Sequence, residues 1–117
     1  MSNTNLLPGK ANDSELLEGI RNGMFLAGSA GGQVDTAKGN FQFNSRYGYR
    51  IVNGKLGAPI KGVSLFGNTL EMLKGLAMVG RKVEVGLPGF CGKYGQMVPV
   101  IGMNPKVRLE NAIVGGR

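Results

Sequence analysis

Short runs in which apolar and polar residues alternate, separated by turns that contain glycine, fill most of the chain from Met24 onward. Alternation with a period of two is typical of strands that bury one face, whereas an amphipathic helix repeats about every 3.6 residues. Glycine reverses the chain easily, and 21 of the 117 residues are glycine. The pattern predicts a β-rich α+β domain whose antiparallel strands form a partly closed barrel or sandwich, with two short helices.

The clearest turn is Asn53-Gly54, because both residues tolerate the positive φ that a two-residue hairpin requires. We therefore expect residues 55–60 to pair antiparallel with residues 47–52. Pro59 cannot donate a ladder hydrogen bond, so this return strand is expected at a sheet edge.

The other predicted strands are separated by turns or links. Alternation places Phe41 and Phe43 on a buried face of one of them. A flexible link is expected at Gly28-Ser29-Ala30-Gly31-Gly32, between the first two strands. In chain order these predicted strands are 24–27, 33–35, 41–45, 63–66, 83–85, 97–102, 106–110 and 112–114.

A first helix is indicated near the N-terminus. Asn12 occupies an N-cap position and Glu15 follows three residues later, which is the pattern of a capping box. This predicts a helix from about Asp13 to Arg21, ended by Asn22-Gly23.

A second helix is predicted after Asn68, which would cap it, with Glu71 in the capping-box position and Gly80 at its end. We expect this helix to be buried against a sheet over much of its circumference. The apolar residues expected in that contact are Leu70, Met72, Leu73, Leu76, Ala77 and Val79.

Length and composition predict a single domain, residues 1–117. No window approaches the roughly 18 apolar residues of a membrane span, and residues 1–5 lack the charged and apolar regions of a signal peptide. One cysteine excludes an internal disulfide and fits a reducing compartment. We therefore expect a cytoplasmic protein without membrane association.

The net charge of +7 raises the question of a nucleic-acid partner. The fourteen Lys and Arg residues are spread singly along the chain, and Arg81-Lys82 is the one adjacent pair. A solvated surface explains this distribution better than a clustered binding stripe, so we do not expect a nucleic-acid site.

The sequence contains no histidine. Without histidine, and with one cysteine and seven carboxylates, the chain cannot supply an ordinary zinc site or a self-sufficient Ser/His/Asp or Cys/His arrangement. No catalytic residue is therefore assigned in this chain, and any chemistry at the cysteine needs partners from outside it.

The only cysteine, Cys91, lies among residues that favour a turn, namely Pro88, Gly89, Gly92 and Gly95. A free cysteine is most often a small buried apolar residue. A thiol on a turn is more accessible, and it can serve as a nucleophile or a metal ligand. The residues alone leave both interpretations open.

Several segments together resemble the C-terminal part of the TldD/PmbA family, the proposed modulators of DNA gyrase. The resemblance covers essentially the whole chain in the correct order, and the form of the Cys91 segment favours the TldD-like branch. The matching segments are residues 1–9, Gly31-Gly32-Gln33-Val34-Asp35, Gly39 with Phe41 and Phe43, residues 51–55, Gly67-Asn68, Met78-Val79-Gly80, residues 91–100 and Val114-Gly115-Gly116.

This resemblance implies a cytoplasmic zinc metallopeptidase, a hydrolase for proteolysis of extended or unfolded peptides. In the family, an HExxxH helix supplies two histidine ligands and a glutamate base, and the cysteine that corresponds to Cys91 supplies the third ligand. A tetrahedral zinc would then keep one position for water. The resemblance also implies a PmbA-like paralogue or a second copy of the chain as partner.

The sequence departs from the family pattern in two respects. The HExxxH segment is absent, so we expect a domain fragment, the C-terminal portion of a larger TldD-like protein, which is inactive alone and does not bind zinc tightly. In addition, Arg81-Lys82 replaces the Asn-Asp that usually follows Met-Val-Gly.

Five further residues are candidates for substrate binding: Gly31, Gly32, Gln33, Lys93 and Gln96. The simpler interpretation is a bulge or link for the paired glycines and solvated turn positions for Lys93 and Gln96. The alternative function is a non-enzymatic β domain that binds a peptide or a partner subunit through a free strand edge. Nucleic-acid binding is the less favoured form of this alternative.

Overall fold

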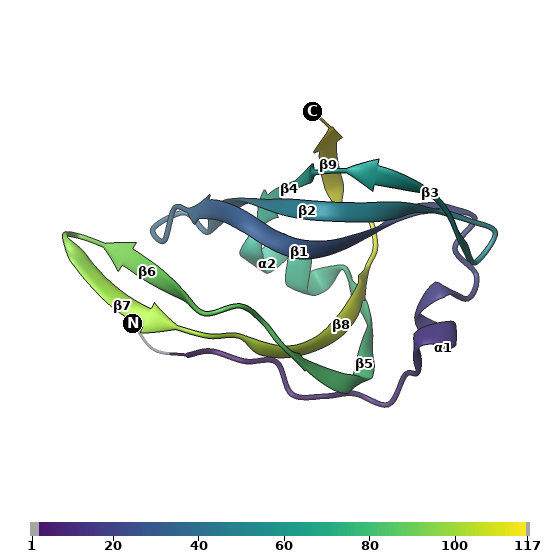
Figure 1. Ribbon diagram of the computed structural model, residues 1–117, viewed down its shortest axis with the longest axis horizontal. Helices are drawn as coiled ribbons and strands as arrows, with labels where there is room; N and C mark the ends of the chain where they lie inside the picture. The colour runs from purple at the N-terminus through teal and green to yellow at the C-terminus, as the bar shows by residue number, and fades with distance from the viewer. Residues whose placement is uncertain (1–2, 117) are drawn as a thin grey trace.

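A computed structural model describes residues 3–116 as a β-rich α+β sandwich with two short helices (Figure 1). The predicted fold class is confirmed in its sandwich form, since the sheets do not close into a barrel. The largest sheet has the order β1-β2-β4-β9, and β3 pairs with the second half of β2. All its pairings are antiparallel. Its strands are β1 (Asn22–Val34), β2 (Asn40–Val52), β3 (Lys55–Lys61), β4 (Val63–Asn68) and β9 (Ile113–Gly116).

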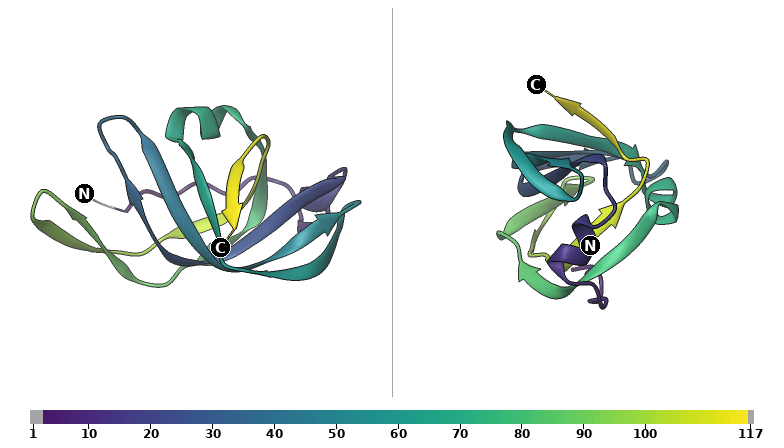
Figure 2. Two further views of the ribbon diagram at one scale, coloured as in Figure 1. Left: turned by 90° about the horizontal axis from the view of Figure 1, so that it is seen from above. Right: turned by 90° about the vertical axis from the view of Figure 1, so that its right-hand side faces the viewer.

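The remaining described strands form two smaller antiparallel pairs. The pair β5–β8 lies across the face of the large sheet, which gives the layered arrangement seen in Figure 2. The hairpin β6–β7 projects beyond this layer, at the left of Figure 1. Their bounds are β5 (Leu76–Val85), β6 (Gly89–Lys93), β7 (Gln96–Val100) and β8 (Met103–Leu109).

The hairpin between β2 and β3 confirms the turn prediction. Asn53 has φ 50° and Gly54 has φ 76°, and Val52 lies opposite Lys55. Pro59 lies in β3, which pairs only with β2 among the described strands, as its missing N–H requires.

The long strands β1 and β2 correct the prediction of shorter ones. The expected link at 28–32 is part of β1, where the register with β2 shifts between Ser29 and Gly32. The predicted strands 41–45 and 47–52 are likewise one strand. A bulge absorbs the extra glycine residues without ending the pairing, so the glycine pattern was wrongly interpreted as a break.

Helix α1 (Asp13–Leu17) has the expected capping box: the Asn12 side chain accepts from Glu15 N at 2.8 Å, and the Glu15 side chain accepts from Asn12 N at 3.2 Å. The prediction that it extends to Arg21 is wrong. Gly19 has φ +80°, a conformation that ends a helix, and the chain enters β1 soon afterwards.

Helix α2 (Thr69–Lys74) is shorter than predicted and is not buried. Asn68 caps it by accepting from Leu70 N at 3.1 Å. The helix ends at Gly75 because the following residues form β5, which pairs with β8. Leu70 and Leu73 are 69% and 53% exposed, so the predicted buried face is wrong.

The core lies between the large sheet and the layer that contains α1 and β8. Its buried apolar residues are Ala11, Leu16, Phe41, Ile51 and Val63. The expectation for Phe41 is confirmed, whereas Phe43 is 43% exposed although its ring stacks on Phe41 at 5.6 Å.

Lys106 on β8 connects three elements. Its Nζ lies 3.3 Å from Asp13 Oδ2 in α1 and 3.4 Å from Glu84 Oε1 in β5, and it lies 5.9 Å from the centre of the Phe25 ring in β1. Partial burial lowers the pKa of Lys106, but the hydrogen bond to Asp13 and the charge of Glu84 outweigh burial and raise this pKa above 10.5.

The N-terminal segment runs along β8 and the residues before it. Asn3 Oδ1 accepts from Ile101 N at 3.1 Å, and Asn5 Oδ1 accepts from Met103 N at 2.9 Å. These asparagine side chains accept hydrogen bonds from backbone donors that no described strand pairs with.

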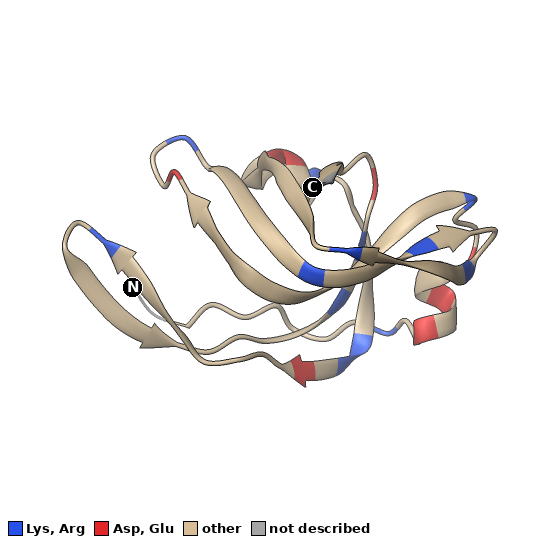
Figure 3. Cartoon of the chain, turned by 45° about the horizontal axis from the view of Figure 1, so that its top comes forward, with Lys and Arg blue, Asp and Glu red and all other residues tan. Residues whose placement is uncertain are grey.

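Basic residues lie apart from one another on several elements, with acidic residues among them (Figure 3). Within residues 3–116, no helix is long and apolar enough to cross a membrane.

Candidate functional site

A trough of about 1180 Å³ lies between the projecting β6–β7 hairpin and the far end of the β1–β2 hairpin. Both hairpins point to the same end of the molecule in Figure 1. The trough brings together five of the six residues assigned from the sequence: Gly31, Gly32, Gln33, Cys91 and Lys93. The β1 residues and the β6 residues are about sixty positions apart in the chain, so this juxtaposition comes from the fold.

Cys91 lies in the middle of β6, opposite Val98 of β7. The prediction that it lies on a turn is wrong, because the reversal occurs at Tyr94 and Gly95, with φ of 51° and 74°. Cys91 is half-buried and lines the trough. Its place on a strand fixes the direction of the thiol better than a turn would.

Gly31 and Gly32 form the bulge in β1. Gly31 has φ +89°, a conformation that favours glycine, and its N–H donates to Ser29 Oγ at 3.3 Å. A Cβ on Gly32 would overlap the Phe43 ring and the Gln42 carbonyl oxygen. The glycines therefore allow β1 to approach β2 closely, which agrees with the bulge interpretation.

Lys93 connects the two walls of the trough, since its Nζ donates to the Val34 carbonyl oxygen at the end of β1. Cys91 and Lys93 are two residues apart in β6 and therefore share a face of the strand. Gln96, in contrast, is exposed at the start of β7 and does not line the trough. Gln33 is exposed and lines it.

Aromatic and aliphatic side chains that the sequence analysis did not assign to a site form much of the trough surface. Phe43 was expected in the core, and Phe66, Leu87 and Phe90 were not assigned at all. All four are more than a third exposed. Their exposure is what marks these large apolar residues as part of a surface site. Exposure depends on the tertiary structure, so the sequence pattern did not reveal it.

Two strands with an unpaired edge border the trough. Within residues 3–116, β1 pairs only with β2 and β6 pairs only with β7. A free strand edge presents backbone N–H and C=O groups that can bind an extended chain.

The described residues contain no group of three or more His, Cys, Asp or Glu side chains that could hold a metal ion. The donor set of this chain therefore does not fit a complete zinc site. Cys91 fits the role of one thiolate ligand, and the remaining ligands would have to come from elsewhere.

The geometry defines a β-sandwich domain with a thiol-lined trough, and comparison with known proteins gives its family. Residues 1–116 match the family described as PmbA/TldA metallopeptidase C-terminal domain. The chain belongs to this PmbA/TldD family.

Curated relatives carry metalloprotease names. A metalloprotease of Methanothermobacter thermautotrophicus is 55% identical over 116 residues, which are 99% of this chain and 25% of the relative. A zinc metalloprotease TldD homolog of Saccharolobus solfataricus is 35% identical over 116 residues, 99% of this chain and 26% of the relative. The chain thus spans about a quarter of the length of these relatives.

Solved structures share the fold. A Bacteroides thetaiotaomicron protein described as a proposed modulator of DNA gyrase superposes with a TM-score of 0.71 at 22% identity, over 95% of this chain and 22% of that one. TldE of Thermococcus kodakarensis also gives 0.71, at 18% identity, over 96% of this chain and 23% of TldE.

Proposed function

We propose that this chain is the C-terminal domain of a TldD-like zinc metallopeptidase that cleaves extended or unfolded peptides, and that Cys91 contributes one metal ligand. The observation that supports this proposal most directly is the position of Cys91 on the wall of the trough, opposite the β1 bulge. The metalloprotease and zinc metalloprotease names of relatives agree with it.

The trough residues would hold the substrate. The backbone edges of β1 and β6 would bind an extended peptide independently of its sequence. Lys93 would keep the two walls together through Val34, and the exposed rings of Phe43 and Phe66 would contact apolar side chains. Gln33 would contact the peptide in the trough. Gln96, which lies outside the trough at the start of β7, would contact only a part of the peptide that extends beyond it.

Catalysis would depend on residues outside this chain, because the remaining ligands and the general base are expected in an HExxxH segment. We infer that the complete assembly acts in the cytoplasm and pairs with a PmbA-like paralogue or a second copy. The chain alone would neither bind zinc tightly nor hydrolyse peptides.

Zinc titration of the isolated chain by calorimetry, together with a peptidase assay on an unstructured peptide, tests the last statement. We expect weak or undetectable binding and no hydrolysis. One tightly bound zinc per chain together with hydrolysis would show that the site is complete without an upstream segment.

A chimera tests the role of Cys91. In this chimera the present chain replaces the matched quarter of the Methanothermobacter thermautotrophicus metalloprotease. We expect Cys91→Ser to abolish peptidase activity and to lower the zinc content, while Met97→Ala, which alters an exposed residue of β7 outside the trough, retains both. Equal activity of the Cys91→Ser chimera would contradict the proposal.

A second candidate function rests on the edges of β1, β6 and β3 that are unpaired within residues 3–116. The chain would then bind a peptide or a partner subunit by adding a strand, without catalysis. Capture of a PmbA-like protein by the chain supports a partner-binding role. Strong DNA binding that falls steeply with salt would instead favour a function of the positive charge.

A further inference from the structure

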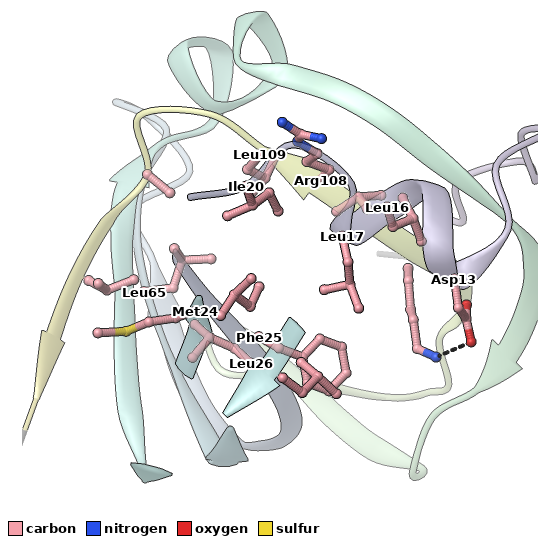
Figure 4. Close-up of a pocket in the computed structure, with 16 residues that line it drawn as sticks. Asp13, Leu16, Leu17, Ile20, Met24, Phe25, Leu26, Leu65, Arg108 and Leu109 are labelled. Atoms are coloured by element: carbon pink, nitrogen blue, oxygen red, sulfur yellow. Dashed lines mark hydrogen bonds and ion pairs between the residues drawn. The ribbon is translucent and has the colours of Figure 1, made fainter. Parts of the chain in front are cut away.

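A second cavity, of about 350 Å³, lies inside the sandwich and shares no lining residue with the trough. It is bounded by the inner face of the large sheet on one side and by α1 and β8 on the other (Figure 4). Leu17, Ile20, Leu26 and Leu65 point toward the empty centre, and Leu16 lines the cavity beside α1. The cavity is therefore a predominantly apolar space in the core.

The volume of the cavity is large for a packing defect. Protein interiors are close-packed, and a dry apolar cavity of about 150 Å³ is enough to bind benzene. The present cavity, at about 350 Å³, has more than twice that volume, which corresponds to roughly 14 non-hydrogen atoms by the same scaling. Ligand pockets in proteins typically begin at about 300 Å³.

The cavity can be reached from solvent. Two of its lining residues, Met24 on β1 and Leu56 on β3, are 36% and 48% exposed. Both carry flexible, unbranched or γ-branched side chains that can move aside for a small molecule.

Three charged residues line the cavity: Asp13, Lys106 and Arg108. The two cations differ in how closely carboxylates surround them. Lys106 is held by two carboxylates, Asp13 at 3.3 Å and Glu84 at 3.4 Å. An additional anion would therefore gain little at Lys106.

Arg108 is less well matched. Its Nη1 donates to the Glu18 carbonyl oxygen at 2.6 Å, and its Nη2 lies 3.9 Å from the carboxylate of Glu110, which is 59% exposed. The Arg108 side chain itself is only 19% exposed. A guanidinium has five N–H donors, so within residues 3–116 the bonds described leave donors for a further carboxylate. Figure 4 places the guanidinium at the rim of the apolar space.

We propose that this cavity binds an amphipathic monocarboxylate, with its aliphatic chain among the leucine side chains and its carboxylate at Arg108. The chain length that fits is about ten to twelve carbons, from the volume comparison above. This inference does not depend on the proposed peptidase function, because neither Cys91 nor the trough takes part.

Calorimetric titration of the chain with decanoate, kept below the concentration at which it forms micelles, tests the proposal. We expect saturable one-to-one binding, with decan-1-ol at least tenfold weaker. Arg108→Gln should weaken decanoate binding by roughly ten- to hundredfold, as for loss of a charge-assisted hydrogen bond. The matched control is Arg81→Gln, which alters an exposed residue of β5 that does not line the cavity. This variant should bind decanoate as tightly as the unaltered chain does.

Leu26→Phe provides a test that does not alter charge, because the larger side chain takes up part of the cavity. It should weaken decanoate binding while circular dichroism stays unchanged. Absence of saturable binding to the unaltered chain, equal affinity for decan-1-ol, or unchanged affinity in Arg108→Gln or Leu26→Phe would each overturn the proposal.

Discussion

Gly32 shows how a single residue determines the wall of the trough. The backbone of β1 lies so close to β2 there that a Cβ on Gly32 would be 2.9 Å from Phe43 Cα. We expect Gly32→Ala to destabilise the chain by about 1–3 kcal/mol, as overpacking commonly does. Urea unfolding followed by circular dichroism measures the change.

Gly89 provides the matched control for this substitution. A Cβ at Gly89, the first residue of β6, would have no neighbour within 4 Å. Gly89→Ala should therefore change the unfolding free energy by less than about 0.5 kcal/mol. Equal effects of the two substitutions would contradict the close approach at the bulge.

Lys106 makes stability depend on pH in the alkaline range. Its pKa is raised above 10.5 in the folded chain, so its ion pairs stabilise the fold fully below pH 10.5. That contribution is lost as the pH rises through the folded pKa. Because the side chains are partly exposed, we expect a contribution of about 1 kcal/mol or less.

Thermal unfolding of the unaltered chain and of Lys106→Met at pH 8 and above pH 10.5 checks this expectation. The difference between the two proteins should shrink at the higher pH. Lys61→Met, an exposed substitution on β3, should show no such convergence. A constant difference for Lys106→Met would mean that its charge does not contribute.

At the level of elements, local sequence signals predicted helix starts better than helix ends. The capping residues Asn12 and Asn68 were identified from sequence because capping is a local interaction. The end of α2 was not, because residues after Gly75 pair with β8, which lies about thirty positions further on. Tertiary pairing therefore overrode the helical pattern.

The two helices should respond differently to the same substitution. Leu16 in α1 is 8% exposed, and Leu70 in α2 is 69% exposed. We expect Leu16→Ala to cost about 2–5 kcal/mol of unfolding free energy. Leu70→Ala should cost less than about 0.5 kcal/mol. A large cost at Leu70 in denaturant unfolding would show that α2 is buried after all.

At the level of the whole molecule, the fold class and the hairpin at Asn53-Gly54 could be predicted from the sequence. Period-two alternation and turn chemistry depend on near neighbours. The trough could not be predicted from these patterns, because it depends on β1 and β6 meeting across the fold. The resemblance of motifs did select Gly31, Cys91 and Lys93, which the structure brings together, whereas Gln96 lies outside the trough.

The central proposal for this chain is that Cys91 would supply one ligand to a zinc ion whose other ligands lie elsewhere. Zinc K-edge absorption spectroscopy of the chimera with the Methanothermobacter thermautotrophicus relative measures the ligands directly. We predict a sulfur neighbour at about 2.3 Å from zinc, which disappears in the Cys91→Ser chimera. A zinc spectrum without sulfur, or one that Cys91→Ser leaves unchanged, would contradict the assignment of Cys91 as a metal ligand.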